Sequence, residues 1–286
     1  MGTFVQLAIA GSDAKQARTA ALACLERMAA LEQVFSRFIP SSQLACLNRE
    51  GFLDAPVPEM VEVLHQALWI NRISGGAYDI TVEPLMACYR QAAVGGNLPD
   101  PRELEETSQK IGSQYVSVDE RRIELIRTGM AITLDSIAKG FIVDRGIGIL
   151  RDFGFQDVMV DAGGDLFASG ANPGNSGWAV GIRSPRRPEG ELIARLGVRD
   201  RAVATSGDYY QAFTNDYQRH HILNPVLGAS MPYLSSATVL APSVMLADAL
   251  ATALMVMEPK DGLEMVSQQP ECQALLVTKD QSILRS

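Results

Sequence analysis

Apolar residues recur along this chain with spacings that predict different elements. Between residues 13 and 37 they return every third or fourth position, which is the period of an amphipathic helix. Residues 58–74 open with a Pro-x-Pro start signal and stop at a Gly pair, as a second helix does. Residues 243–257 are apolar on nearly every side, which predicts a buried helix.

Shorter segments either alternate between apolar and polar residues or are apolar throughout, and turns with Gly or Pro separate them. These segments are expected to be strands. They are residues 3–10, 115–118, 122–126, 131–134, 158–160, 166–169, 178–182, 192–198, 202–205, 235–241 and 274–278. The segment 131–134 is expected to run directly into a helix over 136–153, and a short charged helix is expected at 101–111, after an exposed loop at 92–100. Clusters of strands with helices between them, but without regular alternation, predict an α+β fold rather than a doubly wound parallel sheet.

Composition narrows the class of protein without naming a function. The 286 residues are 47% hydrophobic and 20% charged, which is typical of a globular protein with a sizeable core. A net charge of −8 makes a nucleic-acid partner unexpected. The four cysteines are too far apart for a zinc or redox motif and are expected to be free and mostly packed. No apolar run reaches the roughly 18 residues of a membrane helix, so no transmembrane segment is expected.

The first stretch with chemical content is residues 133–144, TLDSIAKGFIVD. Asp135 or Ser136 can cap the helix expected there, and the free amides of the helix start, together with Lys139, would suit a phosphate group. A capped surface helix with a solvated lysine explains the same pattern, so the stretch alone leaves both interpretations open.

A carboxylate inside the apolar helix at 243–257 is the second signal. An unpaired buried charge costs several kcal/mol, so Asp248 needs a cation or strong hydrogen-bond donors. Thr252 lies four residues later and shares the same helix face. A magnesium ion with oxygen ligands from both residues is one interpretation, and an aspartate bonded to backbone amides is the other.

The remaining polar segments are weaker signals. DAGGD at 161–165, ATSGDY at 204–209 and GAYDITVEPL at 76–85 are explained equally well by turns and by ligand-contacting loops. His220 and His221 stand side by side before Asn224-Pro225. Adjacent side chains usually point apart, so a metal pair is not expected, while one of the two imidazoles can serve as an acid, a base or a ligand contact.

Taken in order, these segments resemble the ApbE family of FAD:protein FMN transferases. The matching segments are MGT at 1–3, GAYDITVEPL at 76–85, LDSIAKGFIVD at 134–144, DAGGDLFASG at 161–170, ATSGDY at 204–209, HHILNP at 220–225 and ADALATAL at 247–254. The resemblance implies an α+β fold with mixed or antiparallel sheets, in which two intertwined lobes of a single domain, residues 1–286, enclose a flavin cleft. It also implies Mg²⁺ as cofactor, FAD as substrate, and an acceptor protein whose Ser or Thr receives FMN while AMP is released.

Carried over residue by residue, the resemblance assigns roles to single positions. Asp248 and Thr252 would be magnesium ligands together with the backbone carbonyl of Ser136, and His221 and Asp248 would be the catalytic residues. The residues implied to line FAD are Met1, Ala77, Tyr78, Asp79, Thr133, Lys139, Thr205, Ser206, Gly207 and Ile222. This chain has Thr133, Asn224 and Leu227 where the family often has Asp, Asp and Thr.

Two other functions fit the same motifs. The chain could hydrolyse FAD to FMN and AMP, with water in place of the acceptor, or it could bind FAD without catalysis. Release of AMP separates both enzymes from the binder, and covalent transfer of flavin fluorescence to a second protein separates transferase from hydrolase. Many family members are exported and lipid-anchored, so the resemblance implies the periplasm or cell envelope, after removal of a leader; an internal, cytoplasmic homologue is the alternative.

Overall fold

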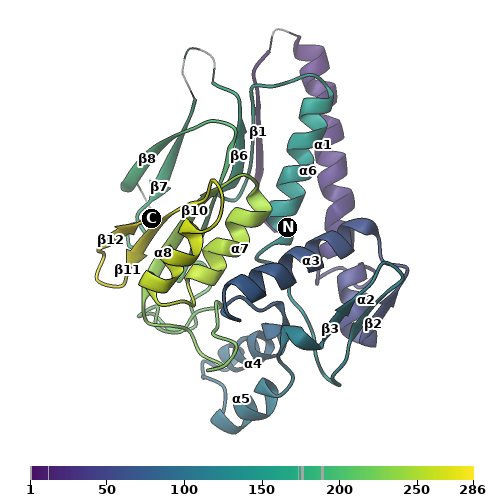
Figure 1. The fold of residues 1–286 in the computed structure, drawn as a ribbon, viewed down its shortest axis with the longest axis vertical. Coiled ribbons are helices and arrows are strands. Elements are labelled where there is room, and N and C mark those ends of the chain that lie inside the picture. Colours follow the sequence, from purple (N-terminus) through teal and green to yellow (C-terminus); the bar gives the residue numbers. More distant parts are fainter. Residues whose placement is uncertain (1, 12, 173, 175–176, 188–189) are drawn as a thin grey trace.

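A seven-stranded antiparallel sheet forms the centre of the computed structural model, which describes residues 2–11, 13–172, 174, 177–187 and 190–286 (Figure 1). Its strands follow the order β1-β5-β6-β9-β10-β11-β12, and every neighbouring pair is antiparallel. Their bounds are β1 Val5–Ile9, β5 Val158–Ala162, β6 Asp165–Ser169, β9 Arg201–Gly207, β10 Leu234–Ala241, β11 Gln273–Thr278 and β12 Ile283–Arg285.

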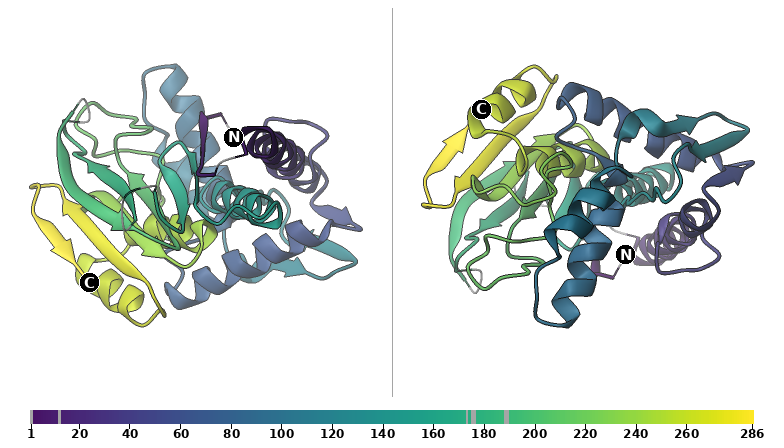
Figure 2. Two further views of the ribbon diagram at one scale, coloured as in Figure 1. Left: turned by 90° about the horizontal axis from the view of Figure 1, so that it is seen from above. Right: turned by 90° about the horizontal axis from the view of Figure 1, so that it is seen from below.

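Three helices cover one face of this sheet, two of them side by side on the strands and the third outside one of these. Helix α7 (Val244–Leu254) packs on β9 and β10, α6 (Ala138–Asp152) packs beside α7, and α1 (Ala14–Phe35) packs outside α6 (Figures 1 and 2). A Cβ on Gly140 would lie 2.5 Å from the carbonyl oxygen of Val244. Glycine is therefore required where the first turns of α6 and α7 meet.

A two-stranded hairpin covers the opposite face. Strands β7 (Trp178–Arg183) and β8 (Leu192–Val198) pair with each other and pack on the large sheet through an apolar cluster. The buried members of that cluster are Leu166, Ala168, Trp178, Val180, Val198 and Val203. Because side chains alternate along a strand, Val203 faces this hairpin while Ala202 and Ala204 on either side belong to the core beneath the helices. The large sheet is thus a buried middle layer.

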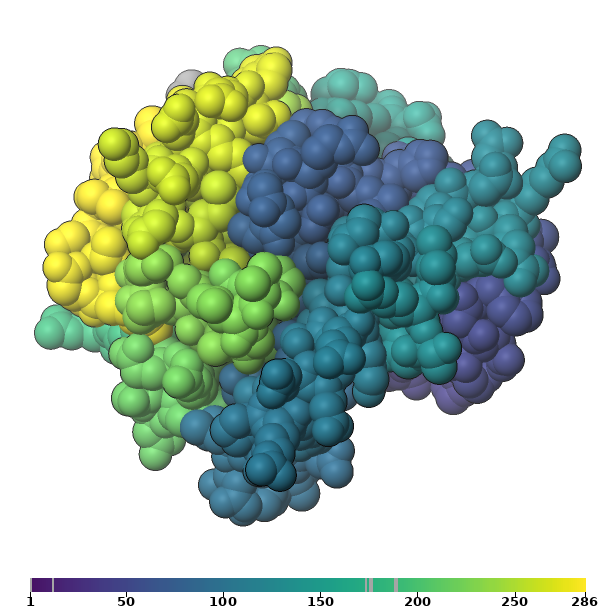
Figure 3. Space-filling view, turned by 60° about the horizontal axis from the view of Figure 1, so that its bottom comes forward, coloured from purple at the N-terminus to yellow at the C-terminus, as the bar shows by residue number. Residues whose placement is uncertain are grey.

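The remaining elements extend the helical side. They are α2 Gln43–Glu50, β2 Phe52–Asp54, α3 Pro58–Ile73, the 3₁₀ turn η1 Ile80–Val82, α4 Glu83–Val94, α5 Pro101–Ser108, the 3₁₀ turn η2 Ser113–Tyr115, β3 Val116–Val118, β4 Arg122–Leu125 and α8 Pro259–Ser267. Strands β2, β4 and β3 form a small sheet of their own, and α4 with α5 projects from one end of the molecule (Figure 3). Among the described residues, no helix has both the length and the apolar character to cross a membrane.

The predicted α+β class with antiparallel sheets is confirmed, and so is the hairpin expected at 115–126. The three helices expected at 13–37, 58–74 and 243–257 are present within a few residues of those bounds. The prediction of free cysteines is also confirmed. The sequence patterns missed α2, α4, α8, β2 and β12, which are mostly short.

The strand expected at 131–134 is wrong, as is the cap proposed for the following helix. Residue Ile132 has no strand beside it, because its backbone N–H and carbonyl are bonded by the side-chain amide of Asn48 at 2.8 Å each. Helix α6 begins at Ala138, and neither expected capping side chain bonds its amides. Asp135 is instead paired with Arg37 at 2.9 Å, and the Ser136 hydroxyl donates to the Tyr78 hydroxyl at 3.1 Å.

Candidate active site

A cavity of about 330 Å³ brings together segments that are distant in sequence. It is lined by the loop before η1, the turn before α6, the ends of β5, β6 and β9, the loop after β9, and α7. The lining includes these residues from the sequence prediction: Ala77, Tyr78, Asp79, Thr133, Ser136, Lys139, Thr205, Ser206, Gly207, His221, Ile222, Asp248 and Thr252. Met1, the other residue expected at the site, lies outside the described residues. The fold therefore gathers the described candidates at one place.

Asp248 is buried at the wall of this cavity and keeps one oxygen free of protein donors. Its residue is 6% exposed, and its Oδ2 atom has no hydrogen-bond partner among the described residues. Burial raises the pKa of Asp248, whereas the nearby Lys139 charge and a hydrogen bond from the Gly140 amide act to lower it. Such an arrangement leaves a carboxylate oxygen available to a cation.

The helix that carries Asp248 is held firmly at its start. The Asp144 carboxylate of α6 accepts hydrogen bonds from the amides of Val244 and Met245 at 2.8 and 2.9 Å, and the Ser243 hydroxyl accepts from Leu246 at 3.3 Å. These bonds satisfy amides that the helix itself leaves without partners. Burial raises the pKa of Asp144 to about 6.

Hydroxyl groups lie beside Asp248 on α7 and on the adjacent strand. Thr252 is one helical turn after Asp248, and its hydroxyl lies 3.1 Å from the hydroxyl of Ser206 in β9. Ser136 lines the same cavity from the turn before α6. A carboxylate with neutral oxygens around it is the kind of donor set that Mg²⁺ uses when substrate phosphates and water complete its coordination.

The metal inferred from the sequence fits this donor set only with help from a substrate. In the part of the chain that the structure describes, no three His, Cys, Asp or Glu side chains gather into a metal site. An all-protein cage for a soft or tightly held metal is therefore absent there, while a hard cation shared with phosphates is compatible with Asp248 and Thr252.

Lys139 is not the solvated surface lysine that was one interpretation of its motif. Its ammonium group is paired with the carboxylate of Asp165, which is almost completely buried at the start of β6. Asp165 also accepts a hydrogen bond from the Thr205 amide at 3.2 Å. The ion pair joins α6 to the sheet and holds a positive charge at the cavity wall.

Tyr78 and Asp79 enter the cavity from the loop between α3 and η1. Tyr78 is 2% exposed, and its burial raises the pKa of the phenol well above its ordinary value. Asp79 lines the cavity, but its carboxylate accepts hydrogen bonds from the backbone and hydroxyl groups of Thr81 and Ser113, at 2.6 to 3.1 Å. Its structural effect is to fix the loop that presents Tyr78.

The two adjacent histidines have different surroundings. His221 lines the cavity, and its Nδ1 atom is buried without a hydrogen-bond partner among the described residues. Burial lowers the pKa of His221, against the opposing effects of the Gln211 backbone and the Asp135 charge. His220 is fully buried behind the cavity, where its backbone groups bond the Ser230 hydroxyl at 2.9 and 2.8 Å. Of the two, His221 is the one placed to meet a ligand.

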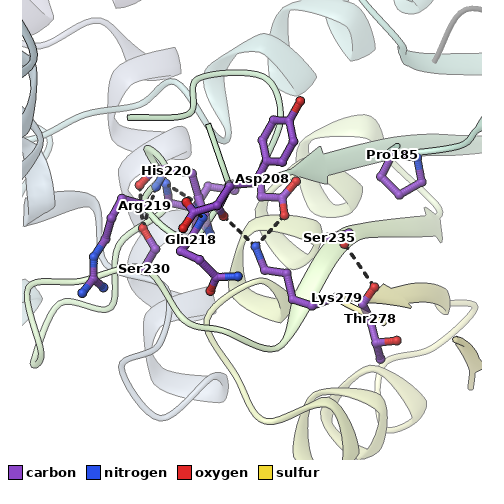
Figure 4. Close-up of polar contacts among 12 residues, drawn as sticks. Pro185, Asp208, Gln218, Arg219, His220, Ser230, Ser235, Thr278 and Lys279 are labelled. Carbon is purple, nitrogen blue, oxygen red and sulfur yellow. Dashed lines mark hydrogen bonds and ion pairs between the residues drawn. The ribbon is translucent and has the colours of Figure 1, made fainter. Parts of the chain in front are cut away.

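A second buried carboxylate anchors the loop that carries His221 (Figure 4). Asp208 follows β9 directly and is fully buried. Its oxygens accept two hydrogen bonds from Arg186, at 2.8 and 2.7 Å, and one from Lys279, at 2.6 Å. Lys279 also donates to the Tyr217 carbonyl at 2.7 Å. The cluster ties the loop to β11 and to the end of the β7–β8 hairpin.

Several residues at the cavity were not singled out from the sequence. Asp165 lies inside a recognised motif but was given no role there, and Asp135 was predicted only as a helix cap and not as part of the cavity wall. Tyr210 and Gln211 also line the cavity but lie in a loop without periodicity. The loop begins beside Asp208, whose partners Arg186 and Lys279 are distant in sequence, so no local pattern reveals how it is held.

Comparisons with known proteins identify similar sequences and a family. The family model described as ApbE family matches residues 1–276. The FAD:protein FMN transferase of Treponema pallidum is 30% identical over 275 residues, covering 89% of this chain and 76% of the relative. The protein of the same name from Escherichia coli strain K12 is 28% identical over 281 residues, covering 94% and 80%.

Solved structures are similar over the whole chain. The ApbE protein of Thermotoga maritima has a TM-score of 0.88 at 30% sequence identity and covers 100% of this chain, with 94% of its own length matched. The flavin transferase ApbE of Vibrio cholerae has a TM-score of 0.84 at 26% identity and the same two coverages. The overall fold is therefore shared with these proteins.

Proposed function

Because this chain belongs to the ApbE family, we propose that it is a magnesium-dependent FAD:protein FMN transferase that moves FMN from FAD to a Ser or Thr hydroxyl and releases AMP. One observation carries the proposal further than family membership does. The buried Asp248 keeps an oxygen without a donor among the described residues, at the wall of a cavity that also contains His221 and Lys139.

The chain's own residues supply a place for the pyrophosphate of FAD. Asp248 and Thr252, with the carbonyl of Ser136, would hold Mg²⁺, which when bound neutralises charge on the phosphate oxygens as AMP departs. Lys139 adds a positive charge on the adjacent wall, and its pairing with Asp165 keeps the ammonium in place. The buried Tyr78 and the small residues at the end of β9 leave room for a planar ring beside the phosphates.

His221 is the residue proposed to accept the proton of the attacking hydroxyl. In the proposed reaction the acceptor hydroxyl oxygen attacks the FMN phosphorus while the bond to the bridging oxygen of the pyrophosphate breaks, and AMP leaves with that electron pair. The hydroxyl proton passes to neutral His221, and the lowered pKa of His221 keeps its imidazole neutral and ready to accept it. The product is FMN joined to the acceptor through a phosphoester.

The proposal is tested with FAD, Mg²⁺ and the acceptor protein of the Vibrio cholerae flavin transferase as probe. We expect AMP release that stops when magnesium is chelated, and flavin fluorescence that stays on the acceptor after denaturation. The control is an acceptor whose target Ser or Thr is replaced by Ala. It should show no flavin fluorescence after denaturation. Release of AMP without any labelled acceptor would identify a pyrophosphatase, and bound FAD without AMP release would identify a binding protein.

A further inference from the structure

The loop that carries His221 is fixed to the rest of the protein at two places. This His221 loop spans residues 208–233, between β9 and β10. Its start is tied to the Asp208 cluster. Farther along, it lies against α4, and Figure 3 shows the light green surface of the loop beside the blue surface of α4 and α5. The main residue of this second contact is Tyr89, which does not line the cavity.

Tyr89 contacts the His221 loop through both its ring and its hydroxyl. Its ring stacks on the ring of Phe213, with centroids 5.1 Å apart and planes inclined by 20°. Its hydroxyl donates to the carbonyl of Gly228 at 2.9 Å. The residue is buried, so its hydroxyl would be costly without that partner. One side chain of α4 therefore holds the loop on both sides of His221.

Backbone hydrogen bonds connect the first of these contacts to His221. The Phe213 amide donates to the Arg219 carbonyl at 2.7 Å, and the His221 amide donates to the Gln211 carbonyl at 3.0 Å. Phe213 thus lies in the arm of the loop that runs beside His221. A shift of the Phe213 ring would be passed to His221 through this short ladder.

The second contact holds a tight turn that follows His221. The Asn224 side chain accepts hydrogen bonds from the amides of Val226 and Leu227, at 2.9 and 3.0 Å. The Gly228 amide donates to the Asn224 carbonyl at 2.9 Å, and Gly228 has a φ of +63°, which favours glycine. The turn is rigid in itself, and the Tyr89 hydroxyl fixes it to α4.

The contact between α4 and the loop is continuous with the wall of the cavity. Tyr89 belongs to a small apolar cluster whose buried members are Val82, Leu85, Met86, Tyr89, Ile111 and Leu223. Three of them, Val82, Met86 and Leu223, also line the cavity. Because Leu223 follows His221 closely in the loop, the packing on α4 determines where this part of the cavity wall lies.

The position of the His221 imidazole matters because proton transfer requires hydrogen-bond distance to the attacking hydroxyl. A displacement of about 1 Å, even from a change far from the reacting atoms, can lower a rate by about 100-fold. The Nδ1 atom of His221 has no hydrogen-bond partner among the described residues. The imidazole therefore depends on the loop backbone for its place.

We propose that Tyr89 is a positioning residue, which holds the His221 loop so that the imidazole meets the attacking hydroxyl. The inference rests on the proposed transferase function and adds a residue outside the cavity through which α4 sets the rate of transfer. Tyr89 itself is not expected to touch FAD or the acceptor.

The experiment measures Tyr89→Phe and Tyr89→Leu, each alone and combined with His221→Ala, using FAD, Mg²⁺ and the Vibrio cholerae acceptor protein. We expect kcat to fall about 3-fold in Tyr89→Phe, which loses only the bond to Gly228, and about 10-fold in Tyr89→Leu, which also loses the ring stack. The affinity for FAD, measured by flavin fluorescence without acceptor, should stay at the wild-type value.

The combined variants separate positioning from general support of the fold. Once His221 is replaced by Ala, no imidazole remains to be positioned, so either Tyr89 change should lower the residual rate by less than about 2-fold. Phe213→Leu loses the same ring stack from the loop side and should behave like Tyr89→Leu. If Tyr89→Leu does not fold, Tyr89→Phe and Phe213→Leu carry the same test.

Tyr115 supplies a matched control. It is a tyrosine of η2 whose hydroxyl bonds to Arg127, and it does not line the cavity. Tyr115→Phe therefore removes one hydroxyl contact at a distance from the His221 loop. Its kcat and its affinity for FAD should both equal those of wild type.

The other outcomes overturn the inference in distinguishable ways. Equal losses of rate with and without His221 would show that Tyr89 acts by another route, and wild-type kcat in Tyr89→Phe, Tyr89→Leu and Phe213→Leu would show that it does not act on the rate. Weaker FAD binding at unchanged kcat would make Tyr89 part of the flavin pocket. In each of these cases the transferase function stands. If wild type labels no acceptor, the transferase function fails and the inference fails with it.

Discussion

Two buried aspartates, one in the cavity wall and one in the cluster beside it, have contrasting environments. Asp208 receives three side-chain hydrogen bonds from Arg186 and Lys279 and is fully buried. Asp248 is nearly as buried, yet its Oδ2 atom lacks a donor among the described residues. In the described part of the chain, both oxygens of the first carboxylate have donors, whereas one oxygen of the second is left for a bound ligand.

The difference indicates which carboxylate serves structure and which serves a ligand. A buried charge with its partners in place stabilises one arrangement of the chain, and loss of one partner is strongly destabilising. A buried charge that lacks a partner costs stability, which a protein tolerates where a ligand compensates for it. Substitutions at the two positions should therefore separate folding from turnover.

The largest expected effect is the loss of turnover in Asp248→Ala. Without this carboxylate, AMP release should fall by about 1,000-fold, equivalent to about 4 kcal/mol of transition-state stabilisation. The free energy of unfolding, measured in urea without metal, should be unchanged or higher, since an unsatisfied buried charge is removed. Wild-type rates of AMP release in this variant would contradict the assignment of Asp248.

Asp208→Ala should give the opposite pattern. Removal of this carboxylate leaves Arg186 and Lys279 without their shared partner, so we expect the free energy of unfolding to fall by about 3 kcal/mol. Both cations are partly exposed, at 25% and 16% of their side chains, and water limits the loss. The folded fraction should keep more activity than Asp248→Ala does. A variant as stable as wild type would remove the structural role given to Asp208.

The pH dependence of stability tests the buried surroundings of His220, which lies near Lys279 of the Asp208 cluster. Burial, with the nearby Lys279 charge, lowers the pKa of His220 to about 3. The unfolded chain takes up this proton below about pH 6.5 and the folded protein does not, so stability falls as the pH falls, by up to about 1.4 kcal/mol per pH unit. Burial of His221 acts in the same direction.

His220→Asn isolates that contribution, because an Asn oxygen can still accept the hydrogen bond that the Ile222 amide makes to His220 Nδ1. Urea unfolding of the metal-free proteins between about pH 7 and about pH 5 should show a smaller loss of stability in the variant. An identical dependence on pH in both proteins would mean that His220 takes up its proton in the folded state.

The sequence allowed a prediction for one of the two aspartates and not for the other. Asp248 could be predicted to be buried because a single charge interrupts an apolar helical run, and local periodicity is enough to show that. The Asp208 cluster joins residues 186, 208 and 279, which are brought together only by the order of strands in the sheet. No spacing along the chain encodes that contact.

Contacts between residues that are distant in sequence also explain the wrong predictions near the active site. The segment 131–134 has the composition of a strand, but Asn48 occupies its backbone hydrogen bonds from another part of the chain. Asp135 and Ser136 have the chemistry of helix caps, but Arg37 and Tyr78 bind their side chains instead. Local propensity was overruled in each case by a partner that is distant in sequence.

The smallest expected effect, the response of thermal stability to magnesium, separates a metal site from a carboxylate that is simply strained. A ligand that binds only the folded state at five times its Kd adds about 1 kcal/mol, which for a chain of this size raises Tm by about 2 °C. Wild type should show this rise in a magnesium titration with FAD present. Asp208→Ala, although less stable, should show the same rise because its metal ligands are intact, and Asp248→Asn should show none beyond that of FAD alone. Equal rises in all three proteins would place the magnesium effect on the nucleotide and leave Asp248 without a ligand.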